Sequence, residues 1–256
     1  MNKTSGAGCF RPCCSLLLEK GEEKPLTREL SDYEKYIRTE ELLGLQKRED
    51  ELACADELTF QVIHQIAELH FKLVMQYLQM AKSAMVAGEP DKAKEHLHRV
   101  NLHMKHLPEV FTMVKVISPL DYHTIRLALG RGSGQDSPGF NQILQFGPTL
   151  WEPFEKLLGE KGLSPLDVHK EPTAHLALYQ LMQELIQFDE GFQSFRYQHL
   201  QLVRRMIGLE TNSLKGIPAQ ALQKGVRHEF YPVLWKAISE LTDWTGSSYN
   251  PRPLGE

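Results

Sequence analysis

Two long segments with apolar residues at helical spacing constrain the fold of this chain more than any other feature. The first covers residues 56–87, about nine turns of helix, and is followed by Gly88 and Pro90, residue types that end helices. The second covers about residues 172–208. Alternating strand patterns are nearly absent from the chain. The sequence therefore predicts the all-α class, a helical bundle built around two long central helices.

Each long segment carries one histidine in a row of otherwise apolar residues. Steps of three and four along the first segment give Phe60, His64, Ala67, Phe71, Val74, Leu78, Ala81 and Met85. The same steps along the second give Leu178, Leu181, Leu185, Phe188, Phe192, Phe195, His199, Leu202 and Met206. An imidazole left unpaired in such a core costs on the order of 1–3 kcal/mol. Each histidine therefore needs a partner.

A further apolar row predicts how deeply the first helix is buried. It comprises Ile63, Ile66, His70, Leu73, Tyr77 and Met80. Only Gln61, Gln65, Glu68, Lys72 and Gln79 remain to face water. We therefore expect this helix to be buried around most of its circumference.

Two interpretations of the core histidines stay open at this level. Each imidazole could bond to a backbone carbonyl or to a nearby tyrosine. Alternatively, the two could serve as axial ligands of an embedded cofactor. A haem suits the aromatic surroundings, because it needs an imidazole for its iron and large apolar walls for its macrocycle.

Shorter helices are predicted on either side of these segments. Ser31 and Glu34 have the spacing of a capping box at the start of an N-terminal helix. A helix is expected from Pro90 onward, with a break or kink at Pro108. Another should cover residues 119–130, where a proline lies in the first turn and a glycine at the end.

The remaining segments predict loops, tails and one domain. The stretches "RGSGQDSPGF" and "LETNSLKGIPAQ" have the composition of flexible polar loops, which often carry binding groups. Residues 1–25 and 246–256 have the composition of disordered tails. The folded domain is expected to span residues 26–245.

Charge and hydropathy exclude several classes of protein. The formal net charge of -4 argues against nucleic acid as the main partner, which would require a concentrated basic face. No apolar run approaches the roughly 20 residues that span a bilayer. The N-terminal residues contain no apolar stretch long enough for a signal peptide. We therefore expect a cytoplasmic protein.

The cysteines do not indicate a metal site. Cys9, Cys13 and Cys14 lie in the N-terminal tail, and Cys54 stands alone before the first long segment. A metal site in the tail would need a fourth ligand and a folded frame. Reduced thiols on a mobile tail are the simpler interpretation.

Four segments in this order resemble the tryptophan 2,3-dioxygenase family, helical haem enzymes within a wider superfamily of haem-dependent aromatic oxygenases. "YEKYIRTEELLGLQ" is similar to the family's N-terminal helix, and "DELTFQVIHQIAELHFKL" to its distal haem segment. "SPLDYHTIRLALGRGSG" is similar to its substrate-binding helix, and "FRYQHLQLVRRMIG" to its proximal segment. Residues 139–173 match poorly.

The resemblance implies a haem b cofactor and roles for four residues around it. His199 would be the proximal ligand of the haem iron. His64 would be the catalytic distal histidine, which hydrogen-bonds the ring nitrogen of the substrate, and Phe60 would pack beside it. Tyr122 and Arg126 lie one turn apart, and the guanidinium of Arg126 has the planar fork that binds a carboxylate through two parallel bonds.

The resemblance also implies a contribution from a second chain. Tyr33, Tyr36 and Ile37 would complete the substrate pocket of a neighbouring subunit, which implies an oligomer, in the family a homotetramer. Ser213 stands where the family has a threonine near the substrate ammonium. The loop around Ser213 and the stretch "QDSPGF" both depart from the family pattern, so the lid over the substrate differs.

The function implied by the resemblance is the first step of tryptophan catabolism by the kynurenine pathway. The enzyme would add both atoms of O2 across the C2–C3 bond of the indole ring of L-tryptophan and give N-formylkynurenine. Because the lid loops differ, a haem-dependent aromatic amino-acid hydroxylase or an indole-modifying oxygenase of the same superfamily is the alternative.

Two classes outside this superfamily fit the same residues less well. A di-iron bundle would need paired Glu-x-x-His motifs, and only Glu95 with His98 has that spacing. A non-enzymatic helical scaffold would explain the bundle. It would leave the two core histidines and the Tyr122 and Arg126 pair unexplained.

Overall fold

The computed structural model describes residues 29–212, 216 and 220–246 of the chain. It divides the chain into two compact units, with the boundary between Leu45 and Gln46. The regular elements of the described residues are α-helices and 3-10 helices, which confirms the predicted all-α class. The expected domain limits, residues 26–245, stay a prediction.

The described part of the first unit contains two short helices, α1 (Asp32–Ile37) and α2 (Thr39–Leu43). The predicted capping box is confirmed: the Glu34 backbone N–H donates to Ser31 Oγ (3.3 Å), and the Ser31 N–H donates to the Glu34 carboxylate (2.8 Å). Arg38 separates the helices, because it adopts a left-handed conformation with φ 55°. Neither helix has a buried residue within this unit.

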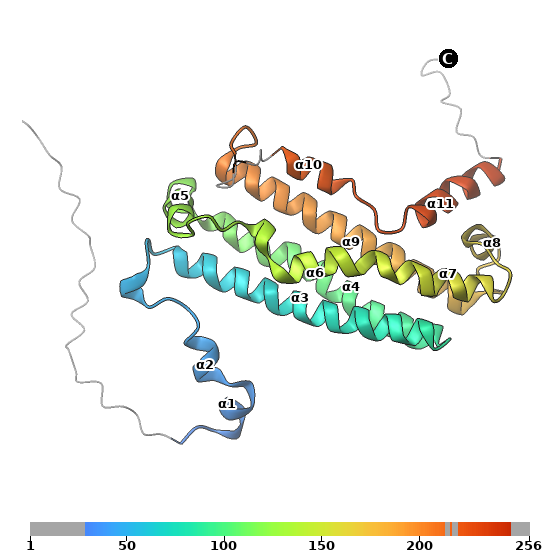
Figure 1. Cartoon of the computed structure of the whole chain (residues 1–256), viewed down its shortest axis with the longest axis horizontal. Helices are drawn as coiled ribbons and strands as arrows, with labels where there is room; N and C mark the ends of the chain where they lie inside the picture. The colour runs from blue at the N-terminus through green and yellow to red at the C-terminus, as the bar shows by residue number, and fades with distance from the viewer. Residues whose placement is uncertain (1–28, 213–215, 217–219, 247–256) are drawn as a thin grey trace, which may run out of the picture. The chain divides into compact units, whose positions relative to one another are not determined.

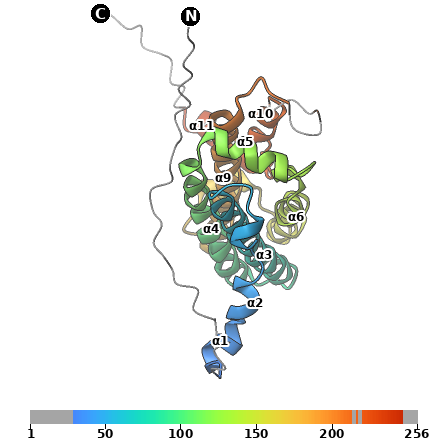
Figure 2. The same cartoon turned by 90° about the vertical axis from the view of Figure 1, so that its left-hand side faces the viewer.

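The second unit is a bundle in which three long helices run alongside one another (Figure 1). These are α3 (Glu57–Val86), α4 (Pro90–Thr112) and α9 (Leu176–Ile207). The helix α4 packs against both α3 and α9, so a third helix joins the predicted pair at the centre. Figure 2 gives the view from the end where α5 (Pro119–Ala128) lies.

Shorter elements complete this unit. They are the 3-10 helices η1 (Glu49–Glu51), η2 (Met113–Val116), η3 (Gly134–Asp136) and η4 (Gly147–Leu150), and the α-helices α6 (Pro138–Phe146), α7 (Trp151–Gly159), α8 (Pro165–Lys170), α10 (Ala221–Val226) and α11 (Pro232–Trp244). The helix α6 packs along α3, and α8 packs against α11. The stretch "RGSGQDSPGF" is therefore largely structured, because it contains η3 and the first turn of α6.

Two predicted helix features differ from the structure. The second long helix begins at Leu176 and not near Pro172, because residues 171–175 form bends and turns. The helix α4 continues through Pro108 without the expected break. Leu107 and Phe111 on either side of that proline are buried, and this packing supports the turn that lacks one hydrogen bond.

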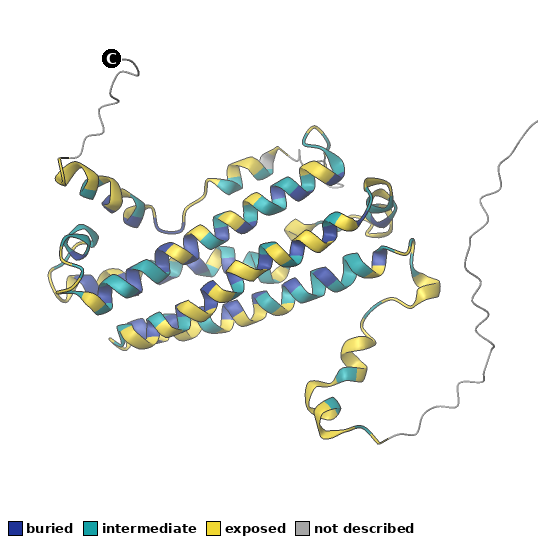
Figure 3. Cartoon of the chain, turned by 180° about the vertical axis from the view of Figure 1, so that it is seen from behind, coloured by how far each residue is buried: buried dark blue, intermediate teal, exposed yellow. Residues whose placement is uncertain are grey.

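The main apolar row of α3 is buried from Ala67 onward, and its flanking row is only partly buried. Phe71, Val74 and Leu78 are buried in the core. Leu73 and Met80, from the flanking row, are 40% and 39% exposed. Figure 3 shows the resulting alternation of buried and exposed residues along the long helices. Ile63 of the flanking row is 4% exposed, so the expected burial of α3 holds in part and fails at Leu73 and Met80.

A buried carboxylate, Asp189 on α9, links α11 to the bundle. Its side chain is 0% exposed. It accepts from the backbone N–H groups of Phe230 (3.0 Å) and Tyr231 (3.1 Å), from the indole N–H of Trp235 (2.9 Å) and from the Gln193 amide (3.1 Å). The carboxylate therefore joins α9 to the start of α11.

None of the helices in the described residues combines the length and the apolar character that crossing a membrane requires. Cys9, Cys13 and Cys14 lie outside the described residues. Cys54 is a half-buried free thiol, with Sγ 3.9 Å from the Asp121 carbonyl oxygen.

Candidate functional site

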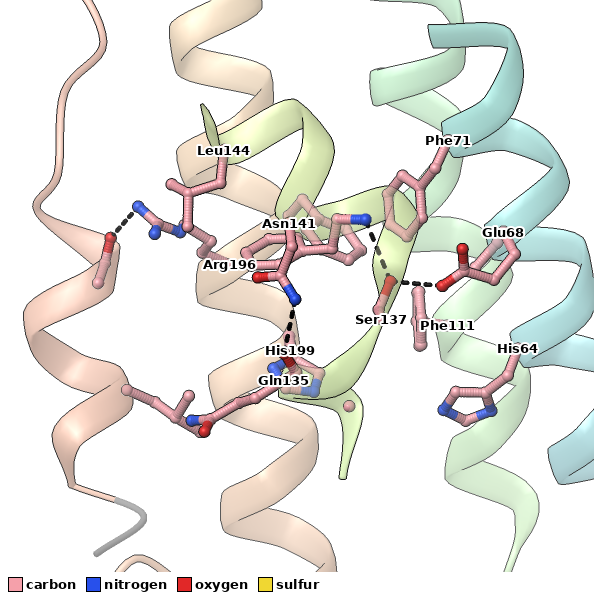
Figure 4. Close-up of a pocket in the computed structure, with 16 residues that line it drawn as sticks. His64, Glu68, Phe71, Phe111, Gln135, Ser137, Asn141, Leu144, Arg196 and His199 are labelled. Carbon is pink, nitrogen blue, oxygen red and sulfur yellow. Dashed lines mark hydrogen bonds between the residues drawn. The ribbon is translucent and has the colours of Figure 1, made fainter. Parts of the chain in front are cut away.

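Two adjoining cavities open between α3, α9 and the segment that precedes α6. The larger has a volume of about 440 Å³, and the smaller about 110 Å³. Both are lined by His64, Gly134, Gln135, His199 and Leu222. The two histidines that interrupt the apolar rows therefore meet at one place in the fold (Figure 4).

His64 uses one ring nitrogen to bond to its own helix. Its Nδ1 lies 2.6 Å from the Phe60 carbonyl oxygen, which can only accept, so Nδ1 carries the proton. Burial lowers the pKa of His64, although the Phe60 carbonyl and the Glu68 carboxylate act in the opposite direction. The neutral ring therefore has an acceptor at Nε2, for which the described residues offer no hydrogen-bond partner.

His199 has no hydrogen-bond partner at either nitrogen among the described residues. Burial, with His64 as a smaller cause, lowers the pKa of His199 to about 4, so the ring is neutral at physiological pH. A Cβ built on Gly134 would lie 3.4 Å from His199 Nε2. The glycine thus leaves open the space next to this nitrogen, where a ligand could bind.

Four phenylalanines contribute to the walls of the larger cavity. Phe71, Phe111, Phe140 and Phe195 all line it. The Phe111 ring lies between the two histidines, with centroids 5.6 Å from His64 and 6.4 Å from His199. These rings provide the broad apolar surface that a flat macrocycle requires.

One cation, Arg196, also lines the larger cavity. It is half-buried, and its guanidinium lies over Phe192 at 5.0 Å from the ring centroid. One nitrogen donates to the Gly225 carbonyl oxygen (2.6 Å). Burial lowers the pKa of Arg196, but an arginine keeps its proton in proteins. The cavity therefore combines apolar walls with a positive charge suited to an acidic group.

The smaller cavity contains the other residues predicted to contact the substrate. Phe60, Tyr122 and Arg126 line it together, at the side facing α5. Burial raises the pKa of Tyr122, against a smaller opposite effect of Arg126. Arg126 is half-buried, and its Nη2 donates to the Asn212 carbonyl oxygen (2.7 Å). The guanidinium has further N–H groups in the same plane, and these could bind a carboxylate.

Four predicted residues cannot be assigned to this site from the structure. Tyr33, Tyr36 and Ile37 belong to the first unit, where their side chains are 70%, 88% and 37% exposed. Ser213 lies outside the described residues. Their roles stay predictions.

Glu68, Ser137 and Gly139 line or support the larger cavity and were missed by the sequence analysis. Glu68 was expected to face water, but its carboxylate accepts from the Ser137 hydroxyl and from the Gly139 N–H (3.1 Å). The sequence did contain one signal, because Ser137 followed by Pro138 is a typical helix start.

A conventional metal site is not seen in the part of the chain that the structure describes. There, no three His, Cys, Asp or Glu side chains come close enough to hold a metal ion. Iron held in a macrocycle differs, because the macrocycle supplies most ligands and the protein can supply a single imidazole. A single imidazole such as that of His199 would suffice for a site of this second kind.

Comparison with known proteins identifies relatives for nearly the whole chain. A sequence model of the family described as tryptophan 2,3-dioxygenase matches residues 20–146. A tryptophan 2,3-dioxygenase of Saccharopolyspora erythraea is 27% identical over 275 residues, covering 88% of this chain and 97% of that protein. One from Herpetosiphon aurantiacus is 26% identical, covering 82% of this chain and 98% of that protein. Over most of its length, the chain is therefore similar to the tryptophan 2,3-dioxygenase family.

Proposed function

We propose that the protein is a haem-dependent tryptophan 2,3-dioxygenase. It adds both atoms of O2 to the indole ring of L-tryptophan and gives N-formylkynurenine, the entry reaction of tryptophan catabolism. The similarity to tryptophan 2,3-dioxygenases supports the reaction class. The observation that carries the proposal is the His199 imidazole, which faces a cavity with aromatic walls and lacks a hydrogen-bond partner among the described residues.

The residues of the larger cavity fit haem b. His199 would hold the iron, since its neutral ring has a free lone pair and Gly134 leaves room beside it. Arg196 would face the acidic groups of the macrocycle, and the phenylalanines would cover its faces. The bound haem supplies the oxygen chemistry, and the protein supplies orientation and exclusion of water.

His64 would orient the substrate ring. Because Nδ1 donates to the Phe60 carbonyl oxygen, Nε2 can accept a hydrogen bond from the indole N–H of tryptophan. Such a bond contributes roughly 0.5–1.5 kcal/mol and fixes one direction of the ring. The Phe60 ring, whose centroid is 4.0 Å from that of His64, would pack beside the indole.

Tyr122 and Arg126 would bind the amino-acid end of the substrate. A carboxylate that enters this apolar cavity must lose its water, which requires a matched cation. Arg126 lines the smaller cavity with Tyr122, on the side of His64 and Phe60. Ser213 would lie near the substrate ammonium, by its position in the sequence.

We further propose that a second subunit completes the pocket, within a homotetramer. Tyr33, Tyr36 and Ile37 would reach the neighbouring subunit's site. The support is that these three residues are exposed within their own unit. The cytoplasmic location expected from the sequence stays a prediction.

The alternative function, a hydroxylase or another indole-modifying oxygenase, is supported by one residue of the same cavities. Gln135, a polar residue in the stretch that departs from the family pattern, lines both of them. A haem-dependent hydroxylase or another indole-modifying oxygenase would use the same iron site and carboxylate site.

Product analysis separates these functions. The purified protein, supplied with haem and reductant, is incubated with L-tryptophan and O2, and the product mass is measured. A gain of two oxygen atoms supports the dioxygenase, and a gain of one supports the alternative. A protein that takes up haem but leaves tryptophan and other aromatic amino acids unchanged would contradict both.

The Arg126→Leu variant tests whether the substrate is a free amino acid. It should keep its haem and its Soret band, while tryptophan binding weakens by about 2–5 kcal/mol, the usual cost of removing one partner of a buried charge pair. Tryptamine, which lacks the carboxylate, should lose little. Arg131→Leu, in the exposed turn after α5, is the matched control. Equal weakening of both ligands, or of neither, would mean that Arg126 does not bind the carboxylate.

A further inference from the structure

We propose that Glu68 is a positioning residue that holds residues 133–139 across the boundary of the two cavities and so places the substrate relative to His199. The inference rests on the proposed function. It concerns a residue whose place in the helical pattern predicted a solvent-facing side chain.

The first observation is the pair of hydrogen bonds that Glu68 accepts. Ser137 Oγ donates to one carboxylate oxygen (Figure 4). The Gly139 N–H donates to the other (3.1 Å). Ser137 Oγ also accepts from the Phe140 N–H (3.1 Å), as the N-cap of α6. The carboxylate therefore binds the first turn of α6 to α3, one turn beyond His64.

The second observation is the close approach of the two backbones at this point. A Cβ on Gly139 would lie 2.5 Å from Phe71 Cβ and 2.7 Å from Glu68 Oε2. Only a glycine allows the segment to lie this near to α3. The contact is thus fixed by both shape and hydrogen bonds.

The third observation is that the same segment continues into the site. Gly134 and Gln135 line both cavities, and Gly134 lies beside His199 Nε2. Internal bonds stiffen the segment, since the Ser133 N–H donates to Asp136 (3.0 Å) and the Asn141 amide donates to the Gln135 carbonyl oxygen (2.9 Å). An anchor at one end therefore fixes the position of the other.

A carboxylate is the side chain that this anchor requires. Two donors converge on it, and hydrogen bonds to a charged acceptor are stronger than neutral ones. A glutamine of the same size would replace one acceptor oxygen with an NH2 group. In Glu68→Gln the bond to Ser137 could persist only in the reverse direction, with the amide donating to the second lone pair of Ser137 Oγ, and without the charge that strengthens it.

The test uses the haem-loaded protein and four variants. Glu68→Gln and Ser137→Ala each remove one side of the anchor, the double variant removes both, and Glu95→Gln on the exposed face of α4 is the matched control. Haem content, the urea midpoint and the Kd of L-tryptophan from its Soret shift are measured for each.

We expect haem content and the urea midpoint of Glu68→Gln to stay close to those of the wild type, while the Kd for tryptophan rises about tenfold. The effects of the two single variants on the Kd should not add up in the double variant, because both variants remove the bond between Glu68 and Ser137. Should Glu68→Gln fail to fold, Ser137→Ala gives the same result from the α6 side.

Two other results separate the possible failures. A wild-type chain that binds neither haem nor tryptophan would overturn the proposed function and this inference with it. A functional wild type, with variants whose Kd stays within about twofold while only the urea midpoint falls, would overturn this inference alone. Additive effects in the double variant would also contradict a shared anchor.

Discussion

Two polar groups on the inward side of α9 have opposite surroundings. Asp189 is fully buried and accepts hydrogen bonds from the backbone, from Trp235 and from Gln193. His199 lies further along the same helix, beside a cavity of about 440 Å³, and the described residues give it no hydrogen-bond partner. One group is satisfied by the protein, and the other is not.

The difference teaches which polar group serves the fold and which serves a ligand. A buried acceptor surrounded by donors stabilises the elements that supply those donors. An imidazole that faces a cavity and has no partner in the protein is available to a ligand. We therefore assign Asp189 to the attachment of α11 and His199 to cofactor binding.

The largest effect is expected from Asp189→Ala. The variant leaves the N–H groups of Phe230, Tyr231 and Trp235 without their acceptor, so the free energy of unfolding should fall by about 3 kcal/mol or more. Urea unfolding of the haem-free protein measures this. Glu190→Ala, the exposed neighbour, is the control. A decrease in the free energy of unfolding below about 1 kcal/mol would mean that Asp189 contributes little to the attachment of α11.

The pH dependence of stability should reveal His199 in the haem-free protein. Burial lowers the pKa of His199 to about 4, whereas in the unfolded chain it should be about 6.5. As the pH falls below about 6.5, the unfolded state takes up a proton that the folded state does not. Stability is therefore highest above about pH 6.5 and falls until about pH 4, by roughly 3 kcal/mol from this residue.

The His199→Ala variant isolates this contribution. Its stability should change less between pH 6.5 and 4 than that of the wild type, and the difference between the two urea curves gives the share of His199. His123→Ala, an exposed histidine on α5, is the control. Parallel pH profiles for wild type and His199→Ala would show that the imidazole is not held neutral by the fold.

A smaller and more selective effect is expected from Gly134→Ala. The added methyl group would lie 3.4 Å from His199 Nε2, an ordinary contact in the haem-free protein that leaves less room for an iron bond. Haem affinity should fall about tenfold, while the urea midpoint of the haem-free protein stays unchanged. Gly159→Ala, where a Cβ meets nothing within 4 Å, is the control. A variant that binds haem as tightly as the wild type would mean that the ligand approaches from elsewhere.

The sequence predicted the helices and the two histidines, because both depend on local periodicity. The rows through His64 and His199 face the interior, as their spacing indicated. The carboxylate-binding pair was placed by family resemblance, and the structure brings Tyr122 and Arg126 to one cavity. The packing of α4 against both long helices was not predicted. An amphipathic pattern indicates which face of a helix is buried, but not which other element covers that face.

The buried carboxylates escaped prediction for a physical reason. Glu68 and Ser137 are separated by 69 positions, and a charged residue at a solvent-facing helical position gives no sign of a distant donor. Asp189 bonds to Phe230, 41 positions away. Hydrogen bonds of this kind depend on the tertiary fold, which periodicity does not determine.

Haem titration tests the central assignment most directly. Wild type and His199→Ala are each titrated with haem, and the Soret absorbance and the helical circular dichroism are recorded. We expect the wild type to bind one haem per chain, and His199→Ala to keep its helical signal without stoichiometric haem. A His199→Ala protein that binds haem as fully as the wild type would contradict the assignment of His199 to the iron.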